Sequence, residues 1–288
     1  MKLLGYDKNG NEPTRIEGVS QPIIHSGEAA KECMDWMIDR GHLKNAFTKP
    51  DNITYITCHN YIDDETGTAE SKLHRYNQLY KSEDGRKITM FEKSLEWIGI
   101  GSPVVLTKPV CGHHITDSDF IEKYGMYSHI MKEEWVLEYL ESDKFPNTEL
   151  VMWCDAGDVI FIDSPQRIID VFYEYDCDLL YSTTAFYHGN KGGYHDDFME
   201  GSAKWQNNLK PGLYLNAGVA IGRADFAKEV LREMLEFKWD KRFTQHPPEA
   251  PEHMKMADDQ EILRYLHPMF YPRMKIDNEG GRKLAWRH

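Results

Sequence analysis

The chain has 288 residues, a hydrophobic fraction of 41% and a formal net charge of −13 at pH 7, as expected for a soluble globular protein of one large or two closely joined domains. The acidic balance disfavours broad electrostatic capture of nucleic acid. Five scattered cysteines form no disulfide framework, and the sequence shows no signal peptide and no membrane-spanning apolar run, so we expect a cytoplasmic protein without a membrane partner.

The N-terminal third begins with a preamble of about 45 residues, judged by its hydrophobic pattern. Within it, apolar residues at helical spacing predict a helix over 27–40, which ends at a glycine. A first strand is predicted over 53–58, a helix over 69–79 and a second strand over 88–91. The order strand, helix, strand is typical of the start of a Rossmann-type βαβ unit.

The next segment combines a polar loop with an amphipathic helix. The run Cys111-Gly-His-His114 invites a zinc interpretation, but it lacks the paired spacing of a structural zinc site, and a loop lining the cleft is favoured. A helix is predicted over 127–140. Its inward side chains are expected to be Ile130, Trp135, Leu137 and Leu140.

The predicted fold is built around the stretch over 150–162. It is apolar on both parities, which is typical of a strand buried on both faces, and Asp155-Ala-Gly-Asp158 interrupts it once. Ligands bind at the carboxyl ends of strands in open α/β sheets, and paired carboxylates without a neighbouring lysine or arginine favour a hard divalent cation. The alternative is a solvated acidic turn between two elements.

The second half of the chain continues the alternation of strands and helices. Helices are predicted over 165–173 and 224–237, and strands over 178–183, 213–222, 274–276 and 283–286. The glycine-rich segment 188–195 lacks the ending of a phosphate-binding P-loop and is expected to be a mobile loop over the cleft.

Two polar blocks in this half are candidates for ligand contacts. Asn216-Ala-Gly218 interrupts a strand, and an amide beside a bare glycine would allow a sugar-sized ligand to approach. Asp258 and Asp259 lie at the start of a predicted helix, where they either contact a ligand or simply cap the helix.

Three motifs, in this order, resemble the GT-A fold of nucleotide-sugar glycosyltransferases, and most closely the procollagen hydroxylysine glucosyltransferase domain of the lysyl hydroxylase type. They are Asp155-Ala-Gly-Asp-Val-Ile-Phe161, Tyr214-Leu-Asn-Ala-Gly-Val-Ala-Ile-Gly222 and Asp258-Asp-Gln260. The resemblance spans about residues 52–286 and implies one GT-A domain over 1–288, in which a Rossmann-like, mixed but mostly parallel sheet is flanked by helices. A nucleotide-binding half is expected over about 50–165 and a donor-sugar and acceptor half over 166–288.

The resemblance also implies roles for individual residues. Asp155 and Asp158 would hold Mn²⁺ or Mg²⁺, which would offset the charge of a UDP leaving group. The remaining implied donor contacts and catalytic side chains are Thr57, His59 and Asn60 at the uridine, Gly157 and Gly218 along the donor, and Asn216, Asp258 and Asp259 at the transferred sugar or the acceptor.

The chain departs from the family's pattern at two places. The family has an aromatic residue within the acidic motif that stacks on uracil, where this chain has Gly157. The family's third metal ligand is a histidine near the end of the domain. His188-Gly-Asn190 has matching letters in the wrong part of the chain, so the terminal residue His288 is the candidate for the third ligand, with a frayed end as the alternative.

The acceptor is the open part of the prediction. Loops 101–125 and 186–210 are expected to build its site, and the second, with His188, Lys191 and Trp205, is expected to close over the donor. The resemblance suggests a collagen-like hydroxylysine. With no secretory signal or hydroxylase domain in the sequence, a microbial or viral setting is favoured, with a glycan or a hydroxymethylated base of phage DNA as acceptor.

Two other classes of function compete with a UDP-sugar-dependent glycosyltransferase. A binding module would keep the fold and the sugar-nucleotide pocket without turnover, and the retained acidic pair and Asp258-Asp-Gln260 weigh against it. A metal-dependent phosphohydrolase would need more clustered histidine and aspartate ligands than the 155–158 region offers.

Overall fold

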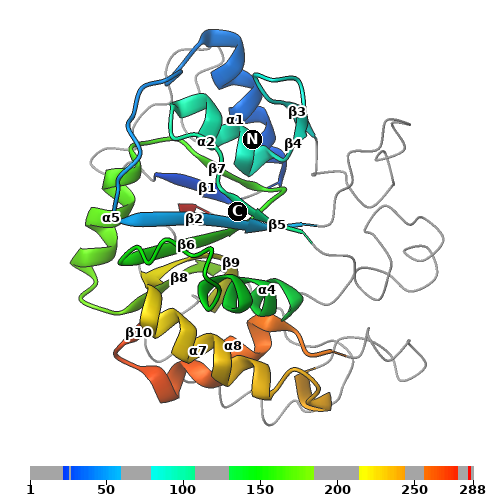
Figure 1. The fold of residues 1–288 in the computed structure, drawn as a ribbon, viewed down its shortest axis with the longest axis vertical. Coiled ribbons are helices and arrows are strands. Elements are labelled where there is room, and N and C mark those ends of the chain that lie inside the picture. The colour runs from blue at the N-terminus through cyan, green and yellow to red at the C-terminus, as the bar shows by residue number, and fades with distance from the viewer. Residues whose placement is uncertain are drawn as a thin grey trace, which may run out of the picture.

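The computed structural model describes residues 22–25, 27–59, 79–107, 130–184, 214–243, 256–277 and 285–286. A six-stranded sheet lies at the centre, with helices on both of its faces (Figure 1). Its strands are, in spatial order, β10 (Met274–Ile276), β8 (Leu179–Thr184), β9 (Tyr214–Arg223), β6 (Leu150–Asp155), β2 (Ile53–Cys58) and β5 (Val104–Leu106). Strand β9 runs antiparallel to its neighbours β8 and β6, and the other pairings in this sheet are parallel.

Strand β6 is buried on both faces, as its apolar sequence predicts. Leu150, Met152 and Cys154 contribute to one hydrophobic cluster, whereas Val151 and Trp153 contribute to the other. The alternation follows from the two-residue period of a strand, and two apolar faces require cover on both sides. The prediction of an α/β protein with a mixed, mostly parallel sheet between helices is therefore confirmed.

The covering helices form two layers (Figure 1). On one side lie α1 (Gly27–Arg40) and α2 (Met90–Ile98), and the core on that side also includes α5 (Pro165–Glu174). On the other side lie α4 (Ile130–Leu140), α7 (Ala224–Glu236) and α8 (Asp259–Phe270). A short 3₁₀ turn, η1 (Lys241–Phe243), follows α7. None of the helices among the described residues is long and apolar enough to cross a membrane.

Helix α4 follows its predicted pattern, with one addition. The four side chains predicted to face inward, Ile130, Trp135, Leu137 and Leu140, are all buried. Glu133 is fully buried with them, because it lies three residues after Ile130 and four before Leu137 on the same face. A carboxyl group on the apolar face of a helix therefore points toward the sheet.

The strand predicted over 88–91 is wrong. Only Lys87–Ile88 is a strand, β4, paired in a hairpin with β3 (Tyr80–Lys81). Thr89 ends it by capping α2: its side chain accepts a hydrogen bond from the backbone of Glu92, whose carboxylate accepts one from the backbone N–H of Thr89. This capping box favours a helix from Met90 onward, so β2 pairs instead with the later strands β5 and β6.

A second, three-stranded sheet shows that the first 45 residues are more than a preamble. It contains β1 (Ile23–His25), β7 (Val159–Phe161) and β11 (Ala285–Trp286). Strand β1 pairs antiparallel with β7, placing His25 opposite Val159, and parallel with β11, placing Ile24 opposite Trp286. Three distant parts of the chain thus meet beside the acidic turn.

Candidate metal centre

The acidic turn joins the two sheets. Asp155 is the last residue of β6, and β7 begins directly after Asp158, so the chain crosses from the large sheet to the small one in three residues. The backbone N–H of Phe91 in α2 donates a hydrogen bond to the carbonyl of Ala156, at 3.1 Å, and so anchors the turn. Both carboxylates lie at the carboxyl end of a parallel strand, where the sequence predicts a site.

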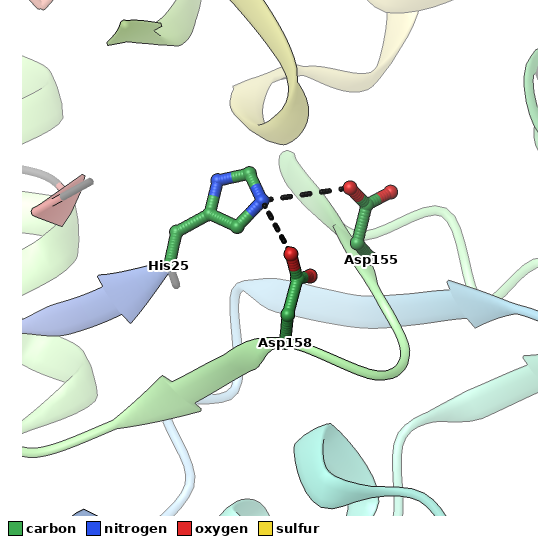
Figure 2. Close-up of side chains that lie close together, drawn as sticks. All are labelled: His25, Asp155 and Asp158. Carbon is green, nitrogen blue, oxygen red and sulfur yellow. Dashed lines mark ion pairs between the residues drawn. The ribbon is translucent and has the colours of Figure 1, made fainter. Parts of the chain in front are cut away.

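His25 completes the cluster from an unexpected direction. Its Nε2 atom lies 3.6 Å from Oδ2 of Asp155 and 3.5 Å from Oδ2 of Asp158 (Figure 2). The histidine side chain is 1% exposed, while those of Asp155 and Asp158 are 37% and 29% exposed. The pairing of β1 with β7 positions the imidazole, because His25 is opposite the residue that follows Asp158. A buried ring therefore faces two carboxylates that solvent can reach.

The spacing of the three ligand atoms fits one divalent cation. All three lie within 4.8 Å of one another. An ion bound at about 2.1 Å would hold adjacent ligand atoms about 3.0–3.5 Å apart, so the distances from His25 to the two aspartates need to shorten only slightly. A donor set of one imidazole nitrogen and two carboxylate oxygens suits Mn²⁺ and other first-row divalent ions, whereas Mg²⁺ prefers oxygen ligands only. The cluster could thus hold one divalent metal ion.

Gly218 makes room for this cluster. It lies on β9 next to Val219, which pairs with Cys154, the residue before Asp155. A methyl group built on Gly218 would overlap the His25 ring and would lie 2.5 Å from Oδ2 of Asp155. The space above this glycine, where a sugar was expected, is occupied by the side chains of His25 and Asp155. Its predicted contact with the donor stays a prediction.

Gly218→Ala is expected to weaken Mn²⁺ binding at least about tenfold, because the added methyl group displaces His25 and Asp155, and even partners that only orient metal ligands are worth this much. Gly222→Ala is the matched control on the same strand. Its methyl group would lie 2.7 Å from the carbonyl oxygen of Asp178, away from the metal ligands, so it should lower the melting temperature but not the Mn²⁺ affinity. Isothermal titration of both variants separates the two outcomes, and equal Mn²⁺ affinities would contradict this role for Gly218.

A largely buried lysine contacts the cluster through Asp155. Lys132 of α4, 13% exposed, donates from Nζ to Oδ1 of Asp155 at 2.9 Å and to the carbonyl of Ala217 at 3.1 Å. Its Nζ is also 3.4 Å from Oδ2 of Asp259, at the start of α8. An ammonium group has three N–H donors, and three acceptors surround this one. Lys132 therefore ties the metal-facing turn to the strand β9 and to helix α8.

Among the described residues around the cluster, negatively charged side chains outnumber positively charged ones. Burial raises the pKa of Glu133 to about 8, with only partial compensation by Lys132, so this carboxyl is mostly protonated at neutral pH. Burial also acts to raise the pKa of Asp155, but Lys132 and His25 outweigh it and hold that pKa well below its usual value. Among the described residues, Asp155 and Asp259 lie within 4 Å of the Lys132 ammonium group, and Asp158 lies beside His25. Such a site attracts a divalent cation.

Asn216 and Gln260 connect the other two sequence motifs. Asn216, 3% exposed, donates from Nδ2 to Oε1 of Gln260 at 2.8 Å, and its own Oδ1 accepts from the backbone of Gly218 and from Ser182. Asp258 caps α8 by accepting from the backbone of Glu261 at 3.0 Å, so its expected capping role is present. The Asn216 amide thus holds β9 against the start of α8, and its predicted contact with a donor sugar stays untested.

The two described residues expected at the uridine have different environments. The Thr57 side chain is buried and donates to the carbonyl of Cys154 at 2.9 Å, which commits its hydroxyl to the sheet. His59 follows the end of β2, with Nε2 3.4 Å from Oε2 of Glu92 in α2. The predicted contacts of Thr57 and His59 with the uridine stay predictions.

The remaining predicted site residues, Asn60, His188, Lys191, Trp205 and His288, lie outside the described residues, as do Cys111-Gly-His-His114 and the helix predicted over 69–79 apart from its last residue. Neither His25 nor Lys132 was predicted from the sequence. For Lys132 a signal existed: the neighbouring Glu133 is a charged residue on the apolar face of α4, and such a residue needs polar partners. For His25 the only signal is that it ends the apolar run Pro22-Ile-Ile24.

In comparisons with known proteins, no family model and no curated sequence matches the chain. The function is therefore inferred from the residues of the site.

Proposed function

We propose that this chain is a metal-dependent glycosyltransferase of the GT-A type, which moves a sugar from a UDP-sugar to a hydroxyl group. One observation supports this most strongly. The three motif blocks that resemble such enzymes are far apart in sequence and meet at one edge of the large sheet. Lys132 contacts the acidic turn and Asp259, and Asn216 contacts Gln260, so all three blocks belong to one connected polar network.

The residues have complementary tasks in this proposal. His25, Asp155 and Asp158 would hold Mn²⁺, or Mg²⁺ more weakly, against the diphosphate. A divalent cation supplies Lewis-acid stabilisation to a diphosphate leaving group. Lys132 and Asn216 fix the two flanking elements relative to the metal ligands, and a preorganised site of this kind avoids reorganisation during the reaction. Asp259, whose Oδ2 lies 3.4 Å from Nζ of Lys132, would contact the transferred sugar or the acceptor.

A binding module without turnover is the alternative that the same residues allow, and a UDP-release assay separates the two. The purified chain is incubated with UDP-glucose, UDP-galactose or UDP-arabinose and Mn²⁺. We expect slow release of UDP by transfer to water with one donor, which a correct acceptor accelerates by at least about tenfold, because a positioned acceptor reacts far faster than bulk water. Peptides with hydroxylysine, glycans and DNA with hydroxymethylated bases are the acceptors to screen.

The assay has two informative failures. Tight binding of a UDP-sugar without release of UDP, with every acceptor, would support a binding module. If neither a UDP-sugar nor UDP binds in the presence of Mn²⁺, the proposed function is wrong. Chelation by EDTA provides the control, because it should stop UDP release while leaving the fold intact.

A further inference from the structure

We infer that Lys132 makes the metal site selective for small divalent cations over Ca²⁺, by restricting Asp155 to a single coordinating oxygen. The inference rests on the proposed metal site and concerns which ion that site accepts. It follows from the way in which Lys132 and the cluster share one carboxylate.

The two oxygens of Asp155 face different partners. Oδ1 accepts a hydrogen bond from Nζ of Lys132 at 2.9 Å, while Oδ2 faces Nε2 of His25 at 3.6 Å and lies over Gly218, 2.5 Å from the position of an added Cβ. Only Oδ2 therefore points toward the position between the three ligand atoms. For Oδ1 to turn toward the same position, the carboxylate would have to break its hydrogen bond to the ammonium group.

Lys132 has little freedom to follow such a rotation. Its side chain is 13% exposed, and the carbonyl of Ala217 and the carboxylate of Asp259 hold the same ammonium group from other sides. A buried lysine that loses one of three acceptors loses a charge-assisted hydrogen bond that water cannot readily replace. The network therefore favours coordination by Asp155 through one oxygen.

Coordination through one oxygen affects cations differently. Ca²⁺ takes six to eight oxygen ligands at about 2.3–2.6 Å and often uses both oxygens of a carboxylate, whereas Mg²⁺ and similar small ions favour octahedral coordination at about 2.0–2.1 Å. The imidazole of His25 further disfavours Ca²⁺. A site in which Asp155 can give only one oxygen thus penalises Ca²⁺ more than Mn²⁺.

The test is the ratio of the Mn²⁺ and Ca²⁺ dissociation constants, measured by isothermal titration with each ion alone. Removal of the lysine charge in Lys132→Met should alter the affinity for both ions, but both carry two charges, so this electrostatic effect largely cancels in the ratio. We expect the wild-type protein to prefer Mn²⁺, and Lys132→Met to reduce that preference at least about fivefold, mainly through tighter Ca²⁺ binding. Lys132→Arg, which keeps a charged donor for Oδ1, should retain the preference.

Lys93→Met provides a matched control, because Lys93 is similarly buried, at 11% exposure, and pairs with Glu96 away from the site. It should leave the ratio unchanged. If Lys132→Met does not fold, as judged by circular dichroism, Lys132→Gln takes its place with the same criterion. An unchanged ratio in a folded Lys132 variant would overturn the role of Lys132 and leave the metal site intact. If the wild-type protein binds neither ion, the proposed metal site itself is wrong.

Discussion

Asp158→Asn is expected to reduce metal-dependent UDP release by about a thousandfold or more, with little change in stability. The substitution keeps the shape of the side chain and removes the charge that a cation requires. Lewis-acid stabilisation of a leaving group is worth several kcal/mol, and about 4 kcal/mol corresponds to a thousandfold in rate. Asp158 is the cleaner choice of the two aspartates, because Asp155 also holds Lys132.

The stability of this variant serves as its control. The Asp158 side chain is 29% exposed and forms an ion pair with His25, so we expect a melting temperature close to that of the wild-type protein in EDTA. The assay is the rate of UDP release at saturating Mn²⁺. Near wild-type turnover in Asp158→Asn would show that this carboxylate is not a metal ligand.

His25→Ala is expected to weaken Mn²⁺ binding at least about a hundredfold. Groups that merely orient a metal ligand contribute about 10–100-fold to metal affinity, and the direct loss of a ligand should cost at least as much. Because His25 is 1% exposed, the variant also leaves a cavity, and its folded fraction has to be checked by circular dichroism. Titration with Mn²⁺ below the melting temperature then gives the affinity of the folded protein.

His59→Ala is the matched control for His25→Ala. His59 lies near the end of a neighbouring strand, is 13% exposed, and pairs with Glu92 instead of the aspartates of the turn. We expect its removal to leave Mn²⁺ affinity within about twofold and to weaken UDP binding instead, by about 1 kcal/mol or a few-fold, as for one lost hydrogen bond. Equal losses of Mn²⁺ affinity in the two variants would contradict a direct role for His25.

Much of the fold is predictable because local patterns agree with the tertiary environment. The apolar run over 150–162 contains β6 and β7, the four inward residues of α4 are buried, and Ala224–Glu236 is the helix that its pattern predicts. Each signal is local, since it depends on the side-chain period of one element. The prediction over 88–91 failed because two local signals disagree there. The β-branched and aromatic residues favour a strand, whereas the Thr89–Glu92 capping box favours a helix.

The two aspartates of the candidate metal site could be predicted from the sequence, and the histidine could not. Asp155 and Asp158 are three residues apart in sequence at the end of a buried strand, so their proximity is a local property. His25 reaches them only because β1 pairs with β7, 134 residues later at Val159, and a strand of three residues gives little indication of its partner. The family resemblance implies a histidine ligand near the end of the chain. Strand β11 at that end does pair with β1. Among the described residues, however, the histidine of the cluster is His25, near the beginning.

The role of Gly218 shows the same limit. A glycine in a strand indicates that something approaches closely, and sequence alone does not say what. A sugar is a reasonable expectation beside Asn216, but the structure brings the His25 ring and the Asp155 carboxylate into that space. Long-range packing thus determines which groups fill the space beside Gly218, although the glycine itself lies in the site as predicted.

The most direct test of the metal centre is pulsed electron paramagnetic resonance of the Mn²⁺-loaded protein, which detects an imidazole nitrogen bonded to the ion. We predict that this nitrogen signal is present in the wild-type protein, absent in His25→Ala and retained in His288→Ala. The opposite pattern, with the signal lost in His288→Ala and retained in His25→Ala, would contradict the assignment of His25, Asp155 and Asp158 as the metal ligands.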